Sequence, residues 1–144
     1  MATALQLLVF TVNKQHYALR LDSVERIVRA VEVTSLPEAS PGLLGVVNIQ
    51  GHIVPVVNFR KRFGLPTRDV DLDDRLIIVD SADRTIALLV DAVVGVVAGQ
   101  EDDVVPSTRI DPGLGYSDGM IKLGEDMVLI PNLSNIVERA LPDE

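Results

Sequence analysis

Four aspartates have the spacing of a calcium-binding loop, and they form one group that could do chemistry. Asp69, Asp71 and Asp73 alternate, and Asp80 falls at the twelfth position of the same segment, as in an EF-hand loop. However, Asp74 stands where the sharp turn of that loop needs glycine. Asp80 is shorter than the usual bidentate glutamate, and the residues before it have the composition of a strand. We therefore predict an exposed connector and no metal site.

A second pair of carboxylates, Asp80 and Asp91, lies at the ends of two apolar runs. Aspartic proteases hold two such aspartates in Asp-Ser/Thr-Gly turns, where the carboxylates share a proton. Here the glycine is missing both times, and Asp91 recurs as Asp22 in an internal repeat, which suits an aspartate that caps a turn. A small hydrolase that uses Asp80 and Asp91 stays an alternative, for which alanine at both positions would abolish turnover.

The remaining reactive residue types indicate no catalytic set. His16 and His52 lie in or beside expected hairpins, and we expect no serine in a nucleophile-elbow setting. The segment 113–115 (GLG) lacks the third glycine and the strand-to-helix setting of a dinucleotide loop. The chain has no cysteine, so it has no disulfide and no thiolate ligand. We predict a non-enzymatic protein with no metal and no cofactor.

Composition favours a protein partner over a charged polymer or a membrane. The 144 residues include 21 acidic and 13 basic side chains, for a formal charge of −8, which does not suit the neutralisation of phosphates. No apolar run approaches the roughly 20 residues of a membrane span, and the start has no basic leader. We expect a cytoplasmic protein with no nucleic-acid partner and no direct membrane insertion.

The segments that carry these residues are predicted to be mainly β-strands. Apolar blocks of about five to eight residues alternate with short polar turns, which is typical of an all-β domain. Residues 7–21 and 76–90 are each predicted to form a hairpin. Pro55 lies inside an apolar run, and because proline has no amide hydrogen, its strand should have an open edge. Asn58 and Asn132 are predicted to cap short helices.

An internal repeat relates the two halves of the chain. Adding 69 to the residue number carries residues 8–28 onto 77–97, and adding 74 carries residues 45–59 onto 119–133, with apolar and turn positions matched. Such self-similarity indicates a duplicated β module. We predict a single domain over residues 1–144, with a first β-barrel half at 5–65, a connector at 66–74 and a second half at 75–141.

Three segments resemble the CheW-like coupling proteins of bacterial chemosensory arrays, and together they span nearly the whole chain. LLVFTVNKQHYALRLDSVERIV is similar to the family opening, and LLVDAVVGVV is similar to its second-half V-D-x-V segment. NIQGHIVPVVNF is similar to the family core N-[LIV]-R-G-x-[IV]-x-P-[IV]-[IV]-[DN]-[LF]. The resemblance implies two SH3-like, five-stranded β-barrels packed on a shared core. It also implies a non-enzymatic adaptor between chemoreceptors and a histidine kinase.

The resemblance implies two protein partners, which are the cytoplasmic tips of chemoreceptors and the regulatory domain of the kinase. It also implies recruitment of this cytoplasmic protein to membrane-associated receptor arrays. The receptor-binding positions it implies, in a groove between the barrels, are Val24, Gly45, Gln50, Leu76, Ile77 and Ala87. The kinase-binding positions it implies are Leu21, Arg26, Val33 and Thr34. A purely structural role stays open for Val24, Leu21, Leu76, Ile77 and Gly45.

Three residues depart from the family pattern. Gln50 stands where arginine is usual, so a charged planar fork is replaced by a neutral amide. Arg26 stands where an acid is usual, with Glu25 one position earlier, and Asn58 replaces the commoner aspartate. These changes predict altered partners in a divergent chemosensory pathway. The alternative is a stand-alone SH3-like module outside chemotaxis, which genomic neighbours would distinguish.

Overall fold

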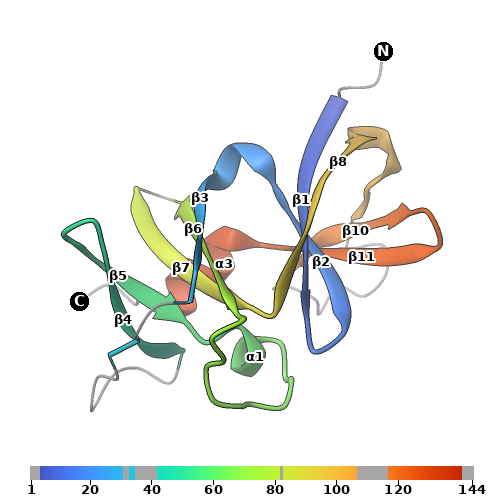
Figure 1. Cartoon of the computed structure of the whole chain (residues 1–144). Coiled ribbons are helices and arrows are strands. Elements are labelled where there is room, and N and C mark those ends of the chain that lie inside the picture. Colours follow the sequence, from blue (N-terminus) through green and yellow to red (C-terminus); the bar gives the residue numbers. More distant parts are fainter. Residues whose placement is uncertain (1–3, 31–32, 35–41, 82, 107–116, 141–144) are drawn as a thin grey trace.

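The computed structural model describes residues 4–30, 33–34, 42–81, 83–106 and 117–140 (Figure 1). These residues form two mixed β-sheets. Sheet A has the strand order β8-β1-β2-β11-β10-β9. Its strands are β1 (Ala4–Val12), β2 (Gln15–Arg20), β8 (Ala92–Gln100), β9 (Val105–Pro106), β10 (Ser117–Leu123) and β11 (Asp126–Pro131).

Sheet B has the order β3-β6-β7-β5-β4. Its strands are β3 (Val24–Arg29), β4 (Leu43–Ile49), β5 (His52–Val57), β6 (Arg75–Ser81) and β7 (Arg84–Val90). The helical elements are α1 (Phe59–Arg62), α3 (Leu133–Ala140) and the 3-10 turns η1 (Leu21–Ser23) and η2 (Glu101–Asp103). In the described part of the chain, no helix is long and apolar enough to cross a membrane. The prediction of an all-β fold with a few short helices is confirmed.

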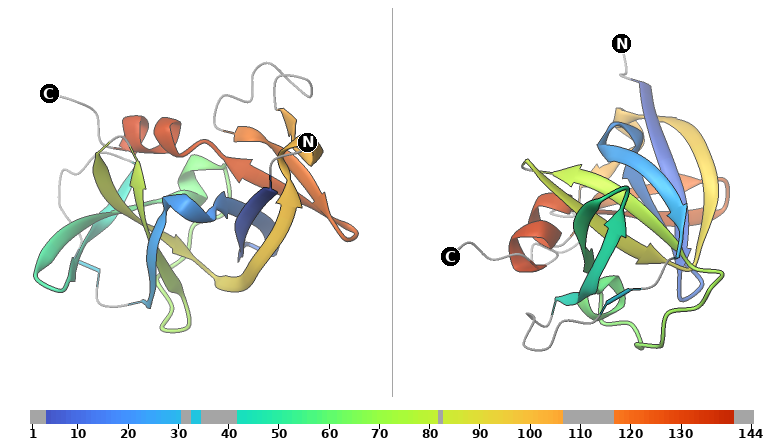
Figure 2. Two further views of the ribbon diagram at one scale, coloured as in Figure 1. Left: turned by 90° about the horizontal axis from the view of Figure 1, so that it is seen from above. Right: turned by 60° about the vertical axis from the view of Figure 1, so that its left-hand side comes forward.

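The two halves of the sequence repeat the same order of elements, but neither half makes a sheet alone. The β1–β2 hairpin of the first half joins β8–β11 of the second, whereas the β6–β7 hairpin of the second half joins β3–β5 of the first. A short parallel pairing joins each hairpin to the strands of the other half. Leu129 of β11 pairs with Tyr17 of β2, and Val56 of β5 pairs with Ala87 of β7. Figures 1 and 2 show the two curled sheets side by side. Sheet A combines blue strands with gold and orange ones, and sheet B combines a blue strand with green and yellow ones.

Pro55 lies where β5 has a neighbour on only one side. Strand β5 pairs with β4 along its length, but it pairs with β7 only at Val56 and Val57. The proline comes just before that short contact, so its missing amide hydrogen does not interrupt the pairing with β7. The prediction of an open edge at Pro55 is confirmed.

Three apolar clusters hold the fold together. One cluster fills the inside of sheet A around Leu7, and a second fills the inside of sheet B around Ile78. The third, which we call the shared core, joins both sheets and includes Phe10, Ile77 and, from α3, Ile136. The side chains of Leu7, Phe10, Ile77 and Ile136 are each 0% exposed. The shared core expected from the family resemblance is therefore present.

The short helices begin where the sequence predicts. The side-chain oxygen of Asn58 accepts a hydrogen bond from the Lys61 amide at 3.1 Å, and that of Asn132 accepts one from the Asn135 amide at 2.9 Å. Each cap satisfies an amide that the first helical turn leaves unpaired. Helix α1 then places Phe59 in the shared core, 1% exposed.

Candidate partner-binding surface

The shared core reaches the surface along β3 at the edge of sheet B. Val24 pairs with Val79, and Ile27 pairs with Ile77. Directly opposed residues of an antiparallel pair place their side chains on one face, and both partners belong to the shared core. Val24 and Ile27 therefore extend this core outward, and Ile27 is 40% exposed.

Strand β8 does the same at the edge of sheet A. Val93 pairs with Phe10, and Val96 pairs with Leu8. Phe10 and Leu8 are both shared-core residues, so Val93 and Val96 lie on the same side as that core. Val96 is 53% exposed. Strands β3 and β8 thus both carry apolar side chains on the side of the shared core.

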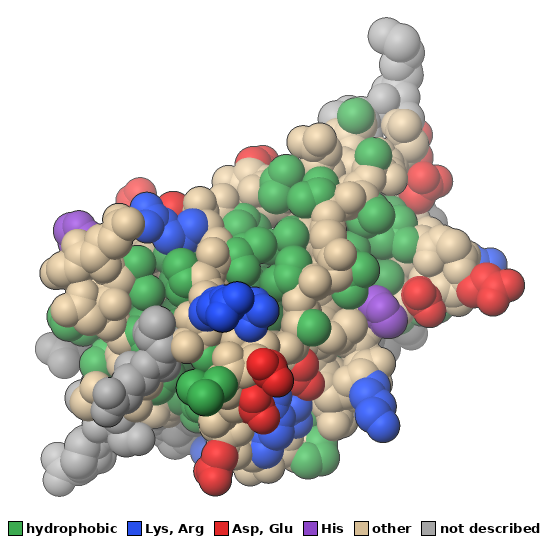
Figure 3. Space-filling view, viewed as in Figure 1, with side chains coloured by type: hydrophobic (Ala, Val, Ile, Leu, Met, Phe, Trp, Pro, Cys, Tyr) green, Lys and Arg blue, Asp and Glu red, His purple; other side chains and the backbone are tan. Residues whose placement is uncertain are grey.

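We call Val24, Ile27, Val93 and Val96 the inter-sheet rim. Figure 3 shows hydrophobic side chains gathered over the region between β3 and β8 on this face. Val94, at 60% exposure, adds to the apolar surface on β8. Contiguous exposed apolar surface on a folded protein commonly marks a binding site. The rim is therefore the strongest candidate for a protein contact.

An open hollow of about 620 Å³ lies at the start of β1, and none of the rim residues lines it. Leu21 and Asp22 of η1 line one wall, and Ala98 and Glu101 line another. Arg20 forms an ion pair with Glu101 across this end. Leu21 also packs against the shared core, so it has a structural role, and its contact with a kinase stays a prediction.

Three predicted receptor positions lie inside the protein. Leu76, Ile77 and Ala87 are each 0% exposed, with Ile77 in the shared core and the other two in the sheet B cluster. Their side chains can shape a binding surface only through the residues packed on them. Val24 is half-buried on the rim, and among the receptor positions it is the one placed where an apolar contact is accessible.

Gly45, Val33 and Thr34 meet at one backbone contact. Thr34 and Val46 exchange two backbone hydrogen bonds of 2.9 Å. A β-carbon added to Gly45 would lie 2.1 Å from the carbonyl oxygen of Thr34 and 3.1 Å from a methyl group of Val33. Gly45 is therefore needed for this close approach, whatever partner it contacts. Val33 is half-buried against the sheet B cluster, and Thr34 is exposed.

The two charge departures, Arg26 and Gln50, lie together at the open end of sheet B. Both line a cleft of about 450 Å³, with Ile53 beside them. Arg26 pairs with Ile78, a residue of the sheet B cluster. It therefore lies on the opposite face of β3 from Ile27, and this cleft is separate from the rim.

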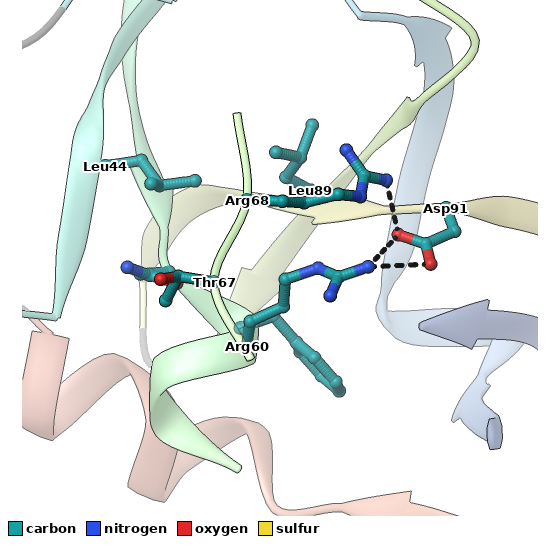
Figure 4. A pocket seen from close by; sticks show the side chains of 8 residues that line it. Leu44, Arg60, Thr67, Arg68, Leu89 and Asp91 are labelled. Carbon is teal, nitrogen blue, oxygen red and sulfur yellow. Dashed lines mark hydrogen bonds and ion pairs between the residues drawn. The ribbon is translucent and has the colours of Figure 1, made fainter. Parts of the chain in front are cut away.

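Asp91 is the centre of an ion-pair cluster that holds the connector (Figure 4). Its carboxylate accepts hydrogen bonds from Nη2 of Arg60 at 3.0 and 2.8 Å, from Nη2 of Arg68 at 2.8 Å and from the backbone amide of Asn13 at 2.8 Å. Arg68 also donates to both carboxylate oxygens of Asp74 at 2.9 and 2.6 Å. These hydrogen bonds hold four separate segments of the chain together.

The electrostatics of this cluster keep the Asp91 carboxylate charged. Burial raises the pKa of Asp91, but the hydrogen bonds from Asn13 and Arg60 and the charges of Arg60 and Arg68 outweigh burial, so the net pKa lies below its ordinary value. The hydrogen bond to Asp74 raises the pKa of Arg68. The adjoining cavity, about 20 Å³, has room for about one water molecule. The arrangement is one of structural support.

The predicted connector is exposed except at its end. Residues 66–73 are exposed, whereas Asp74 is 2% exposed and was predicted to be solvated. That expectation is wrong for Asp74 because Arg68 and the amide of Asp71 satisfy its carboxylate. Within the described residues no cluster of acidic and histidine side chains could hold a metal ion. The segment 113–115 lies outside the described residues.

The structure separates the two aspartates of the hydrolase alternative. Asp80 lies near the turn of the β6–β7 hairpin and accepts a hydrogen bond from the Thr85 hydroxyl at 2.6 Å. Asp91 follows the opposite end of β7, where Val90 pairs with Arg75. Five residues of strand at about 3.3 Å each place the carboxylates on the order of 15 Å or more apart. They cannot share a proton.

One serine has the spacing of a nucleophile elbow, against the expectation from the sequence. The segment 115–119 reads GYSDG, which matches Gly-x-Ser-x-Gly. Ser117, however, begins strand β10 and is 6% exposed. Its hydroxyl lies 3.2 Å from the carbonyl oxygens of Gly119 and Ile130, to which it donates. It lacks the exposed strand-to-helix turn that the motif requires.

Three rim residues were missed by the residue-level predictions, namely Ile27, Val93 and Val96. The signal was nevertheless present in the repeat. An offset of 69 carries Val24 onto Val93 and Ile27 onto Val96. Because the structure keeps the repeat, these pairs occupy matching places on the edge strands β3 and β8.

Comparison with known proteins identifies the family. The model of the CheW-like domain matches residues 6–141, so the chain belongs to the CheW-like domain family. It is similar to the "Chemotaxis protein CheW" of Bacillus subtilis, with 30% identity over 102 residues, covering 71% of this chain and 65% of the relative. It is 26% identical over 133 residues to the protein of the same name from Thermotoga maritima, covering 92% and 87%.

The fold is also similar to a solved structure. The scaffolding protein TtCheW from Thermoanaerobacter tengcongensis superposes with a TM-score of 0.84 and 29% sequence identity. The match covers 94% of each chain. The topology of two sheets on a shared core is therefore that of a CheW structure.

Proposed function

We propose that this chain is a non-enzymatic chemotaxis adaptor that couples chemoreceptors to a histidine kinase. Family membership over residues 6–141 supports the chemotaxis role, and relatives bear the names chemotaxis protein and scaffolding protein. The observation that carries the proposal beyond the family is the inter-sheet rim. It presents apolar side chains from both sheets on one face, as a surface for a helix would.

In this proposal a receptor tip binds the rim. Ile27 and Val96 supply exposed apolar area, and Val24 and Val93 connect that area to the shared core. Burying Val96 and Ile27 under an amphipathic helix removes apolar surface from water at little cost in polar groups. The kinase regulatory domain binds elsewhere on the first half, where Leu21, Arg26, Val33 and Thr34 were predicted to act.

The test is a titration of the purified protein with a chemoreceptor tip fragment and with the kinase regulatory domain from the same organism. Val96→Lys and Ile27→Lys should each weaken receptor binding by about tenfold or more, because the charge would be desolvated in the complex. Met127→Lys is the matched control. Met127 is 51% exposed and lies on β11, near the tip of its hairpin, away from the rim.

Three outcomes separate the possibilities. Loss of binding in both rim variants, with the control within about threefold of wild type, supports the proposal. Equal effects of all three substitutions would show that the rim is not the receptor surface. If neither partner binds the folded wild-type protein, the adaptor role is wrong, and a stand-alone SH3-like interaction module becomes the better hypothesis.

A further inference from the structure

Strand β8 is an edge of sheet A that has a neighbour on one side only. It comes first in the strand order of that sheet, and in the described part of the chain it pairs with β1 alone. A bulge at Val94 interrupts this pairing once, and Gly95–Gln100 then keep a regular register with Ala4–Val9. In the right-hand view of Figure 2, β8 (gold) runs along the outer side of sheet A. Such an edge presents backbone N–H and C=O groups that can pair with another strand.

The other three sheet edges in the described residues carry features that discourage such pairing. Strand β3 (VERIVR) has three charged side chains, and charge opposes edge-to-edge pairing. Strand β4 exchanges two backbone hydrogen bonds with Thr34 through Val46, which covers part of its edge. Strand β9 has two residues and ends at Pro106, and both shortness and proline protect an edge.

Strand β8 (AVVGVVAGQ) has neither charge nor proline. Four of its nine residues are valine, which favours strands. Val94 and Val96 are 60% and 53% exposed, and Val97 is 36% exposed. Val97 pairs with Leu7 and so lies on the side of the sheet A cluster, opposite to Val96. Strand β8 therefore exposes apolar surface on both faces beside its open edge.

The sequence of β8 is compatible with a second copy of itself. When a strand pairs antiparallel with its own copy, a two-fold axis places the residues near its middle opposite one another. Like charges in directly opposed positions destabilise a strand pair, and β8 has no charged side chain. Valine opposite valine or alanine removes apolar surface from water. A two-fold pair of β8 strands is therefore free of repulsion within the strands.

The charges beyond the two ends of β8 also suit an antiparallel pair. The 3-10 turn η2 follows β8 directly and contains Asp102 and Asp103, which are exposed. At the other end, the β1–β2 turn places exposed Lys14 beside the start of β8, because β1 runs antiparallel to β8. Within the described residues, none of these three side chains forms an ion pair. An antiparallel pair brings the acidic end of each copy to the Lys14 end of the other.

We propose that β8 is a self-association edge, at which two copies of this chain pair antiparallel and join their A sheets into one continuous sheet. Backbone hydrogen bonds hold the pair, the valines pack across it, and Lys14 of each copy faces the η2 acids of the other. One strand pair is a small interface, and each copy has a formal charge of −8. We therefore expect a weak dimer, with a Kd on the order of 100 µM. The self-association edge does not depend on the adaptor role.

The first test uses the absence of cysteine from the chain, since a single introduced cysteine can form a disulfide only between two copies. Val96→Cys, Val97→Cys and Ala98→Cys probe β8, and Met127→Cys, at a 51% exposed residue of β11, is the matched control. Directly opposed residues of an antiparallel pair have β-carbons about 5 Å apart, close to the separation in a disulfide. Under mild oxidation, at least one β8 variant should form linked dimer about tenfold faster than the control. Non-reducing electrophoresis measures the rates.

The second test measures the reversible dimer by sedimentation equilibrium, at protein concentrations up to about 1 mM. Val96→Lys should raise the Kd at least about fivefold, because the pair brings the two introduced charges close together. Lys14→Glu should raise the Kd about threefold or more through repulsion from the η2 acids. Lys122→Glu makes the same charge change at an exposed residue of β10, and its effect should be smaller than that of Lys14→Glu.

Three results would contradict the self-association edge. These are a wild-type protein that stays monomeric at every concentration, β8 cysteines that link no faster than Met127→Cys, and equal effects of Lys14→Glu and Lys122→Glu. Cysteine is smaller than valine and uncharged, so the cross-linking test still decides if Val96→Lys fails to fold. Because the protein is measured without a receptor or a kinase, the self-association edge and the adaptor role can fail independently.

Discussion

Sheets A and B share one backbone plan but expose different surfaces at equivalent edges. The outward residues of β3 are Glu25, Ile27 and Arg29, and an offset of 69 carries them onto Val94, Val96 and Ala98 of β8. One edge is thus charged and the other apolar. Exposed edges invite unwanted strand pairing, and charge discourages it. The apolar edge of β8 is open to such unwanted pairing, and a bound partner would cover it.

The features common to both sheets are those that the backbone demands. Gly45 and Gly119 are equivalent, and each lets a neighbouring segment approach closely. Asn58 and Asn132 are also equivalent, and each caps a helix. The duplicated halves therefore agree on turns, caps and close contacts, whereas they differ on side chains that face solvent. Substitution of equivalent residues can test this division.

The largest difference is expected between Phe59 and its equivalent Leu133. Phe59 is 1% exposed and stacks on Phe63 with ring centroids 4.4 Å apart, whereas Leu133 is half-buried. Phe59→Ala should lower the free energy of unfolding by about 4 kcal/mol because it leaves a cavity in the shared core. Leu133→Ala should cost about 1.5 kcal/mol. Urea denaturation measures both, and similar losses would contradict the unequal roles of the two helices.

The glycine pair should show a smaller difference in the same direction. The added β-carbon in Gly45→Ala would lie 2.1 Å from the Thr34 carbonyl oxygen, and that in Gly119→Ala would lie 2.5 Å from the Val105 carbonyl oxygen. Both contacts force the backbone apart. We expect losses in unfolding free energy of about 3 and about 2 kcal/mol, measured by denaturation. A neutral Gly45→Ala would show that the approach of residue 34 contributes little to stability.

Asp91 and its equivalent Asp22 differ in their partners. Asp91→Asn should lower the unfolding free energy by about 1.5 kcal/mol at pH 7, because the bonds to Arg60 and Arg68 lose their charge. The folded-state pKa of Asp91 is lowered, so its contribution is full above about pH 4 and is lost as the pH falls further. Wild type and Asp91→Asn should therefore converge in acid. Asp22→Asn, at an exposed residue, should change stability little at pH 7.

The smallest effects on stability are expected at the rim. Ile27→Lys and Val96→Lys should each change the unfolding free energy by about 0.5 kcal/mol or less, since both residues are already exposed by 40% or more. Thermal denaturation by circular dichroism would measure this. A large loss in either variant would show that the residue belongs to the core, and its effect on receptor binding would then have another explanation.

Local features of the fold could be predicted from the sequence, but the choice of strand partners could not. Apolar blocks separated by short polar turns indicated the hairpins at residues 7–21 and 76–90, and the two asparagines indicated the helix starts. The same pattern contains no information about which hairpin joins which sheet. The exchange of β1–β2 for β6–β7 depends on contacts between residues far apart in the sequence.

The predicted binding residues show a related limit. Leu76, Ile77 and Ala87 belong to strands buried on both faces, whose continuous apolar runs cannot distinguish core from surface. Asp74 was expected in solvent because its neighbours are polar, and only the three-dimensional position of Arg68 explains its burial. Arg26 and Gln50 were identified as unusual, but their shared cleft became visible only in the structure.

The exchange of hairpins also sets an order for assembly on the ribosome. The β1–β2 hairpin is synthesised before every strand of sheet B, yet its partners β8 and β11 are synthesised after all of them. All five strands of sheet B are available once translation has passed Val90. Sheet B can thus form before the β1–β2 hairpin has its partner strands. Until then the apolar residues on both faces of that hairpin are exposed to other nascent chains. The β1–β2 hairpin is therefore translated before sheet B but joins its own sheet later than the strands of sheet B join theirs.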